Sequence, residues 1–109
     1  MKDGTLVVLK VDGTKEALRV PGELKVEQLQ KLVGGWVEPV RIKYEGRMRT
    51  AFVNENGKLL GLKPNFRATC CFKAANIIPT SDFIVGNMAV WLPTPVNKEK
   101  AHGANTFCG

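Results

Sequence analysis

The stretch from Asn54 to Arg67 contains the densest group of side chains suited to binding a polar ligand. Asparagine side chains offer hydrogen-bond donors and acceptors, lysine and arginine pair with anions, and a glycine lets a ligand approach the backbone closely. The residues predicted to contact a ligand are Asn54, Glu55, Lys58, Asn65 and Arg67. In the alternative interpretation the asparagines and glycines only build turns, while Leu59, Leu60 and Leu62 fill the core.

A second group of candidate side chains flanks the turn at Glu45-Gly46. Its basic residues are Arg41, Lys43, Arg47 and Arg49. Alternate residues of two strands joined by a turn would place all four cations on one solvent face. That face would bind nucleic-acid phosphates, with Tyr44 or Trp36 as a stacking group. The alternatives are an ordinary solvated sheet face, and a Trp36 side chain that covers the core.

The residue types that catalysis needs are scattered along the chain. The single histidine, His102, lies in the C-terminal tail, so a nucleophilic triad would require the tail to fold back. The acidic residues lack the paired spacing of a two-carboxylate hydrolase or a metal site. Cys70 and Cys71 are adjacent, which in an extended chain points their side chains apart, and Cys108 adds no C-x-x-C spacing. We expect no catalytic residue, metal or cofactor, and keep an enzyme of unknown class as an alternative.

The first half of the chain predicts a hairpin followed by a helix. The β-prone segments Leu6–Leu9 and Ala17–Val20 flank the turn residues Asp12-Gly13. Pro21-Gly22 is expected to break the second strand. Apolar residues then recur at helical spacing from position 26 to 33, and Gly34-Gly35 supplies the C-cap of a short amphipathic helix.

The second half predicts another hairpin and a closing strand. Trp36–Tyr44 and Arg47–Asn54 alternate as strands around Glu45-Gly46, and Pro39 should place the start of the first at a sheet edge or bulge. An irregular region follows, broken at Pro64-Asn65. Asp82–Leu92 is the last strand, with a bulge expected at Gly86.

This order of elements predicts a small α+β domain with one helix packed on an antiparallel or mixed sheet. A β-grasp-like topology is one candidate. Residues 1–95 are expected to form the single domain and 96–109 a polar C-terminal tail. A chain of 109 residues with 44% hydrophobic residues suits one core. No apolar stretch approaches the ~20 residues of a membrane span, and the N-terminus has no signal pattern, so we expect a cytoplasmic protein.

Three segments together resemble a known family. They are Leu29–Glu38, Val53–Asn65 and Asp82–Gly86, with the pattern LQ-x-x-VGG-x-x-E, N-E-x-G-K-L-x-G-L-x-x-N and D-x-I-x-G. This order is similar to the uncharacterised family called domain of unknown function 3846, over about Leu6 to Leu92. The resemblance implies a small protein of the kind often carried by phages, plasmids and other mobile elements, with no assigned activity.

These observations lead to three functional hypotheses. The first is a non-catalytic binding module of mobile-element type that binds a host protein or small polar ligand through the Asn54–Arg67 loop. The second is a nucleic-acid-binding protein that uses the basic hairpin Arg41–Arg49; the net charge of +6 would attract polyanions without giving specificity. The third is an enzyme of unknown class. No membrane partner is expected.

Overall fold

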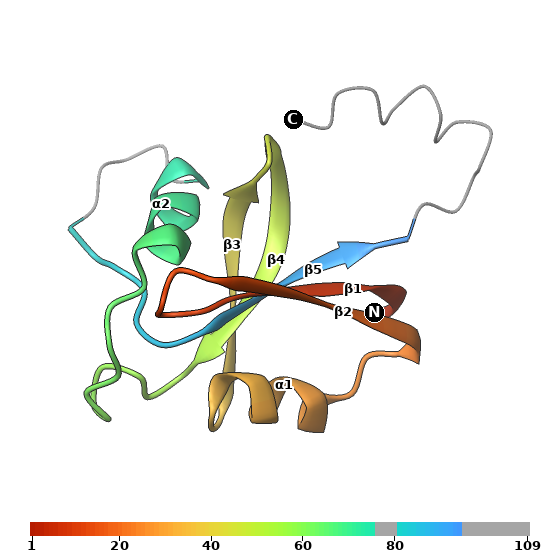
Figure 1. Cartoon of the computed structure of the whole chain (residues 1–109), viewed down its shortest axis with the longest axis horizontal. Coiled ribbons are helices and arrows are strands. Elements are labelled where there is room, and N and C mark those ends of the chain that lie inside the picture. The colour runs from red at the N-terminus through yellow and green to blue at the C-terminus, as the bar shows by residue number, and fades with distance from the viewer. Residues whose placement is uncertain (76–80, 95–109) are drawn as a thin grey trace.

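The computed structural model describes residues 1–75 and 81–94, and within them it forms an α+β domain (Figure 1). The elements in chain order are β1 (Lys2–Leu9), β2 (Lys15–Glu23), α1 (Val26–Val33), β3 (Val37–Tyr44), β4 (Arg47–Asn54), α2 (Phe66–Ala75) and β5 (Met88–Pro93). The structure confirms the predicted α+β fold class, the two predicted hairpins and the predicted first helix. No helix in the described ranges is long and apolar enough to cross a membrane.

The five strands form one sheet in the order β2-β1-β5-β4-β3. Every neighbouring pair is antiparallel, including β1 with β5, so the sheet is not mixed and differs there from the parallel pairing of a β-grasp sheet. Pro39 lies in the edge strand β3, as expected. Pro21 does not end β2, because the pairing of β1 with β2 shifts register there, and Gly22 donates a backbone hydrogen bond to the Asp3 side chain at 2.7 Å.

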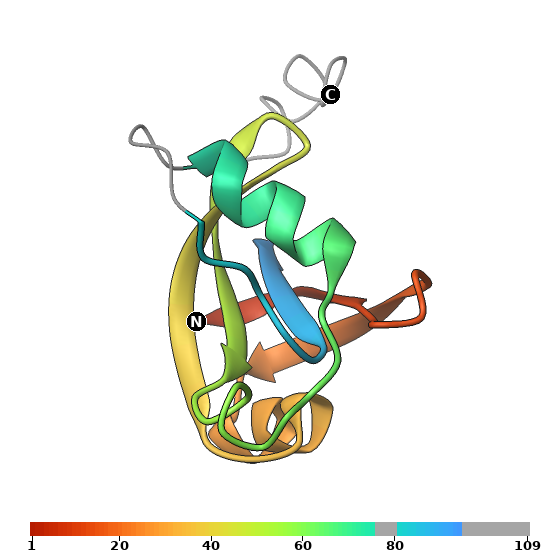
Figure 2. The same cartoon turned by 90° about the vertical axis from the view of Figure 1, so that its left-hand side faces the viewer.

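The two faces of the sheet carry separate cores, each covered by one helix (Figures 1 and 2). Successive side chains of a strand point to opposite faces, so the continuous apolar run Leu6–Leu9 is buried on both sides. Leu6 and Val8 pack in the cluster that includes Leu29 of α1. Val7 and Leu9 pack in the cluster that includes Ala68 of α2. The strand β1 therefore contributes side chains to both cores.

Helix α1 begins and ends as its sequence indicates. At its start the Lys25 backbone N–H donates to the Gln28 side chain at 3.0 Å. At its end Gly34 adopts the left-handed conformation, with φ of 81°, and its N–H donates to the Gln30 carbonyl at 2.8 Å. Leu29 and Val33 form the buried side of this short helix.

Helix α2 is the element that the sequence analysis missed. We interpreted Pro64-Asn65 as a break, but Asn65 is a helix N-cap whose side-chain oxygen accepts the Ala68 backbone N–H at 3.0 Å. Cys70 and Cys71 therefore lie on a helix and not on an extended chain. The closing strand is also shorter than predicted: β5 begins at Met88, and the preceding segment is a loop in which Gly86 has a φ of 77°.

Asn65 is 1% exposed and joins three parts of the fold. Its amide nitrogen donates to the carbonyls of Leu9 at 2.8 Å and Gly86 at 2.9 Å, while its oxygen caps α2. The side chain therefore holds the end of β1, the approach to β5 and the start of α2 in one arrangement.

We expect Asn65→Ala to lower the free energy of unfolding by about 3 kcal/mol, because it leaves buried backbone groups without partners. The exposed neighbour Lys63 provides the control, and Lys63→Ala should change stability by no more than about 0.5 kcal/mol. Urea denaturation followed by circular dichroism measures both. Equal stability of the two variants would contradict the structural role of Asn65.

Candidate functional site

A hollow of about 330 Å³ lies between the β3–β4 hairpin, the loop after β4 and the segment before β5. Its apolar lining is formed by Val40, Val53, Phe72, Ile84 and Val85. The apolar residues Leu59 and Phe83 also line it. Its charged lining residues are Glu38, Glu55, Lys58 and Asp82. Of the five residues predicted to bind a ligand, the hollow brings together Asn54, Glu55 and Lys58, whereas Asn65 and Arg67 are outside its lining.

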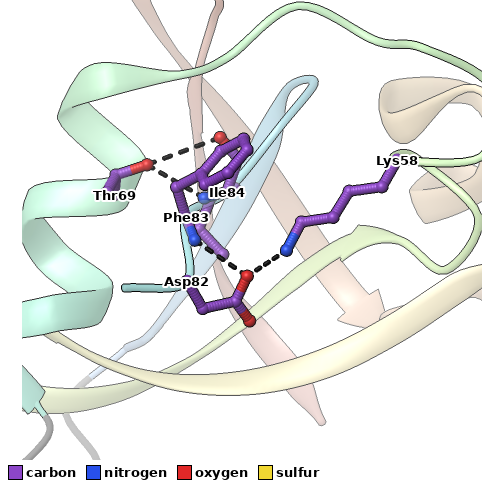
Figure 3. A network of polar contacts seen from close by, with 5 residues as sticks. All are labelled: Lys58, Thr69, Asp82, Phe83 and Ile84. Atoms are coloured by element: carbon purple, nitrogen blue, oxygen red, sulfur yellow. Dashed lines mark hydrogen bonds and ion pairs between the residues drawn. The ribbon is translucent and has the colours of Figure 1, made fainter. Parts of the chain in front are cut away.

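Lys58 connects the loop to the segment before β5 (Figure 3). Its ammonium group donates to the Asp82 carboxylate and lies 4.8 Å from the centre of the Phe83 ring. The Phe83 backbone N–H donates to the same carboxylate at 2.9 Å. The hydrogen bond from Lys58, followed by that from Phe83, lowers the pKa of Asp82. The hollow thus contains a lysine ammonium held by a carboxylate and an aromatic face.

The segment before β5 is itself fixed to α2. Thr69 accepts a hydrogen bond from the Ile84 backbone N–H at 2.9 Å, and its hydroxyl lies 3.4 Å from the Ile84 carbonyl oxygen (Figure 3). The hydroxyl is also 2.8 Å from the Asn65 carbonyl oxygen. Helix α2, absent from the sequence prediction, therefore positions one wall of the hollow.

Glu38 and Glu55 supply two further carboxylates. Glu38 pairs across the hairpin with Val53, and the Glu55 backbone N–H donates to the Trp36 carbonyl at 2.8 Å, which continues the pairing by one step beyond the strand ends. The two glutamates are therefore diagonal neighbours across the hairpin. Both are exposed, and neither forms an ion pair with another residue in the described ranges.

Asn54 is part of the scaffold beneath this site. It is buried, its amide nitrogen donates to the Val33 carbonyl at 3.1 Å, and its oxygen accepts the Asn56 backbone N–H at 2.8 Å. A Cβ on Gly35 would lie only 2.9 Å from that amide nitrogen, so the second glycine of the pair leaves room for Asn54. Because Asn54 and Asn65 both use their amides inside the fold, we do not retain them as ligand-binding groups.

The apolar residues around the site are more exposed than expected. Leu59 is 88% and Leu60 is 61% exposed, so the prediction that these leucines fill the core is wrong, whereas Leu62 is partly buried. Trp36 is 68% exposed, so it does not cover the core. Arg67 is exposed on α2. Hydropathy predicted that Leu59, Leu60 and Trp36 would be buried, but the path of the backbone leaves all three side chains at the surface.

The basic hairpin does not have the predicted single cationic face. A two-residue turn at Glu45-Gly46 pairs Tyr44 with Arg47, Lys43 with Met48 and Arg41 with Thr50. Directly paired residues share a face. Arg41 and Lys43 therefore lie on one face, whereas Arg47 and Arg49 lie on the other, together with the buried residues Ile42 and Tyr44. Arg41 also donates to the Thr50 hydroxyl at 2.9 Å.

The described residues contain no cluster of three or more side chains suited to a metal ion. Cys70 and Cys71 are free thiols, and burial, followed by the neighbouring Cys70, raises the pKa of Cys71. His102, Cys108 and the predicted tail from 96 to 109 lie outside the described residues. Within the described residues, the candidate site is therefore the hollow with its apolar and charged lining.

We expect Lys58→Met to raise the pKa of Asp82 toward its ordinary value, because the substitution removes the donor that favours the carboxylate. Since Lys58 lowers the pKa in the folded state, its stabilising effect is present at neutral pH and is lost as pH falls through the folded-state pKa of Asp82. An NMR titration of side-chain carboxyl carbons measures the change. Asp12 is the internal control, because its pKa is lowered chiefly by the Thr14 hydroxyl and should not change. An unchanged Asp82 titration would show that Lys58 does not interact with it in solution.

Comparison with known proteins identifies the family of the chain. No curated protein and no solved structure matches the chain significantly. A family model described as Domain of unknown function (DUF3846) matches residues 2–103 and so includes every element of the fold and the whole lining of the hollow. The chain belongs to this family, DUF3846.

Proposed function

We propose that the protein is a small non-catalytic binding module of a mobile element that works in the cytoplasm and binds a host protein. The hollow beside the 54–59 loop receives an apolar side chain of that partner. The observation that carries the proposal is the combination of an apolar lining with a very exposed Leu59 at the same hollow. An apolar pocket with a few polar groups is the usual form of a binding site.

The exposed leucines lie on a loop whose backbone is hydrogen-bonded within itself. The Leu60 N–H donates to the Asn56 carbonyl at 2.9 Å, and the Leu62 N–H donates to the Gly57 carbonyl at 3.0 Å. The loop is also joined to the segment before β5, since the Gly86 N–H donates to the Lys63 carbonyl at 2.7 Å. A partner that covers Leu59 would remove its apolar surface from water with little ordering cost in the loop.

The hollow can be tested with N-acetyl-leucine amide, a neutral probe with one apolar side chain. When the probe is added at millimolar concentration, we expect the largest changes in the protein's amide chemical shifts at Val40, Val53 and Ile84 in two-dimensional NMR spectra. Leu59→Ser should weaken binding several-fold without changing stability by more than about 0.5 kcal/mol, since the side chain is exposed. Leu60→Ser is the matched control, because Leu60 is exposed but does not line the hollow. Shift changes located elsewhere, or equal effects of both variants, would contradict the proposal.

Nucleic-acid binding is a second candidate, favoured by the shape of the basic hairpin. Strand β5 pairs only with Ala51 and Phe52 of β4, so the distal part of the β3–β4 ribbon projects beyond it (Figure 1). Arg41 and Lys43 are exposed on one face of this projection. Two cations on a projecting ribbon would contact successive phosphates of a nucleic-acid strand.

For this candidate, two phosphate contacts predict that the logarithm of the affinity for single-stranded DNA falls with the logarithm of salt concentration, with a slope of about −1.4. Arg41→Ala/Lys43→Ala should abolish that slope. Lys15→Ala/Arg19→Ala removes the same charge from exposed positions of the edge strand β2 and should leave most of the slope in place. Fluorescence anisotropy of a labelled oligonucleotide measures the affinity of each variant. If both double variants lost the same affinity, the binding would depend on net charge alone and this candidate would be contradicted.

A further inference from the structure

The charged lining of the hollow indicates which partner side chain it accepts, and this step rests on the proposed function. Four charged residues line the hollow: Glu38, Glu55, Lys58 and Asp82. Lys58 and Asp82 pair with each other, which leaves the two glutamate carboxylates as the uncompensated charges. The hollow is therefore locally acidic, although the chain as a whole has a net charge of +6.

The charges that line the hollow, and not the net charge of the chain, determine which ligand charge the hollow favours. Exposed charges are screened beyond about 8 Å at physiological ionic strength, so the basic residues spread over the rest of the chain contribute little to a ligand inside the hollow. Glu38 is the direct cross-strand partner of Val53, and Glu55 follows Val53 by two residues along the chain. A side chain with an apolar stem and a cationic end would pack its stem against Val53 and place its charge beside the carboxylates.

Lys58 shows that this surface accommodates a cation. Its ammonium group already binds Asp82 and lies over Phe83, a carboxylate and an aromatic face contributed by the same wall. Because Lys58 pairs with Asp82, Glu38 and Glu55 are the acidic residues of the lining that remain for a ligand.

We propose that the hollow recognises a lysine or arginine side chain next to an apolar residue in an exposed segment of the partner protein. The apolar neighbour contacts Leu59 and the apolar lining, and the cation lies between Glu38 and Glu55. An acidic segment is disfavoured at the same place, because its carboxylate would approach two like charges that form no ion pair within the described residues.

The test uses three synthetic heptapeptides of the form Gly-Gly-Leu-X-Leu-Gly-Gly, with lysine, glutamine or glutamate at X. Two-dimensional NMR titration of the full chain gives both the affinity and the location of binding. We expect all shift changes to centre on the hollow and the lysine peptide to bind roughly three- to tenfold more tightly than the glutamine peptide, as two exposed ion pairs allow. The glutamate peptide should bind most weakly, and added salt should reduce the lysine preference.

The variant Glu38→Gln/Glu55→Gln should bind the lysine and glutamine peptides equally. Glu27→Gln is the control, because Glu27 is an exposed carboxylate on α1 that does not line the hollow, and it should retain the preference. Equal binding of all three peptides in the hollow of the unmodified chain would overturn the cation preference while supporting the proposed function. Absence of shift changes in the hollow with every peptide would overturn the proposed function itself.

Discussion

The buried amide of Asn65 is the contact on which the second half of the fold depends. It joins the end of β1, the approach to β5 and the first turn of α2 through two donated hydrogen bonds and one accepted hydrogen bond. The carbonyls of Leu9 and Gly86 would otherwise be buried beside an apolar core, at a cost of about 1–3 kcal/mol for each unpaired group. An aspartate could cap the helix but could not donate to these carbonyls, so the position requires an amide.

Asn54 performs the corresponding task at the other end of the same loop. It fixes the loop to the end of α1, while Asn65 fixes it to α2. Polar side chains that face inward in this way satisfy backbone groups, and the turns between them leave Leu59 and Leu60 directed outward. The exposure of these leucines is thus a consequence of how the asparagines are used. The inward-facing asparagines and the exposed leucines therefore belong to one short stretch of sequence.

Much of the fold was predictable because it depends on local signals. The hairpin turns, the apolar spacing of α1 and the glycine at its C-cap each act within a few residues. Helix α2 was missed because its apolar pattern is weak and Asn65 was interpreted as a turn residue, although asparagine is also a preferred N-cap. The exposure of Trp36 was not predictable, since hydropathy does not show which apolar side chains the tertiary packing leaves uncovered. The two faces of the basic hairpin could have been deduced from its two-residue turn, which pairs odd-numbered with even-numbered positions.

That turn also places Glu38 on the opposite face of the β3–β4 ribbon from Arg41 and Lys43. Glu38 belongs to the face that carries Ile42 and Tyr44, at the base of the ribbon, whereas Arg41 and Lys43 belong to the opposite face toward the tip. Arg47 and Arg49 share the face of Glu38, but they lie toward the tip of the ribbon, whereas Glu38 lies at its base. Because a register change of one residue in β3 would turn Ile42 outward and Arg41 toward the core beneath α2, the buried side chains enforce the register that keeps Glu38 and Arg41 on opposite faces. The packing of the core therefore determines on which face of the ribbon Glu38 and the exposed cations Arg41 and Lys43 lie.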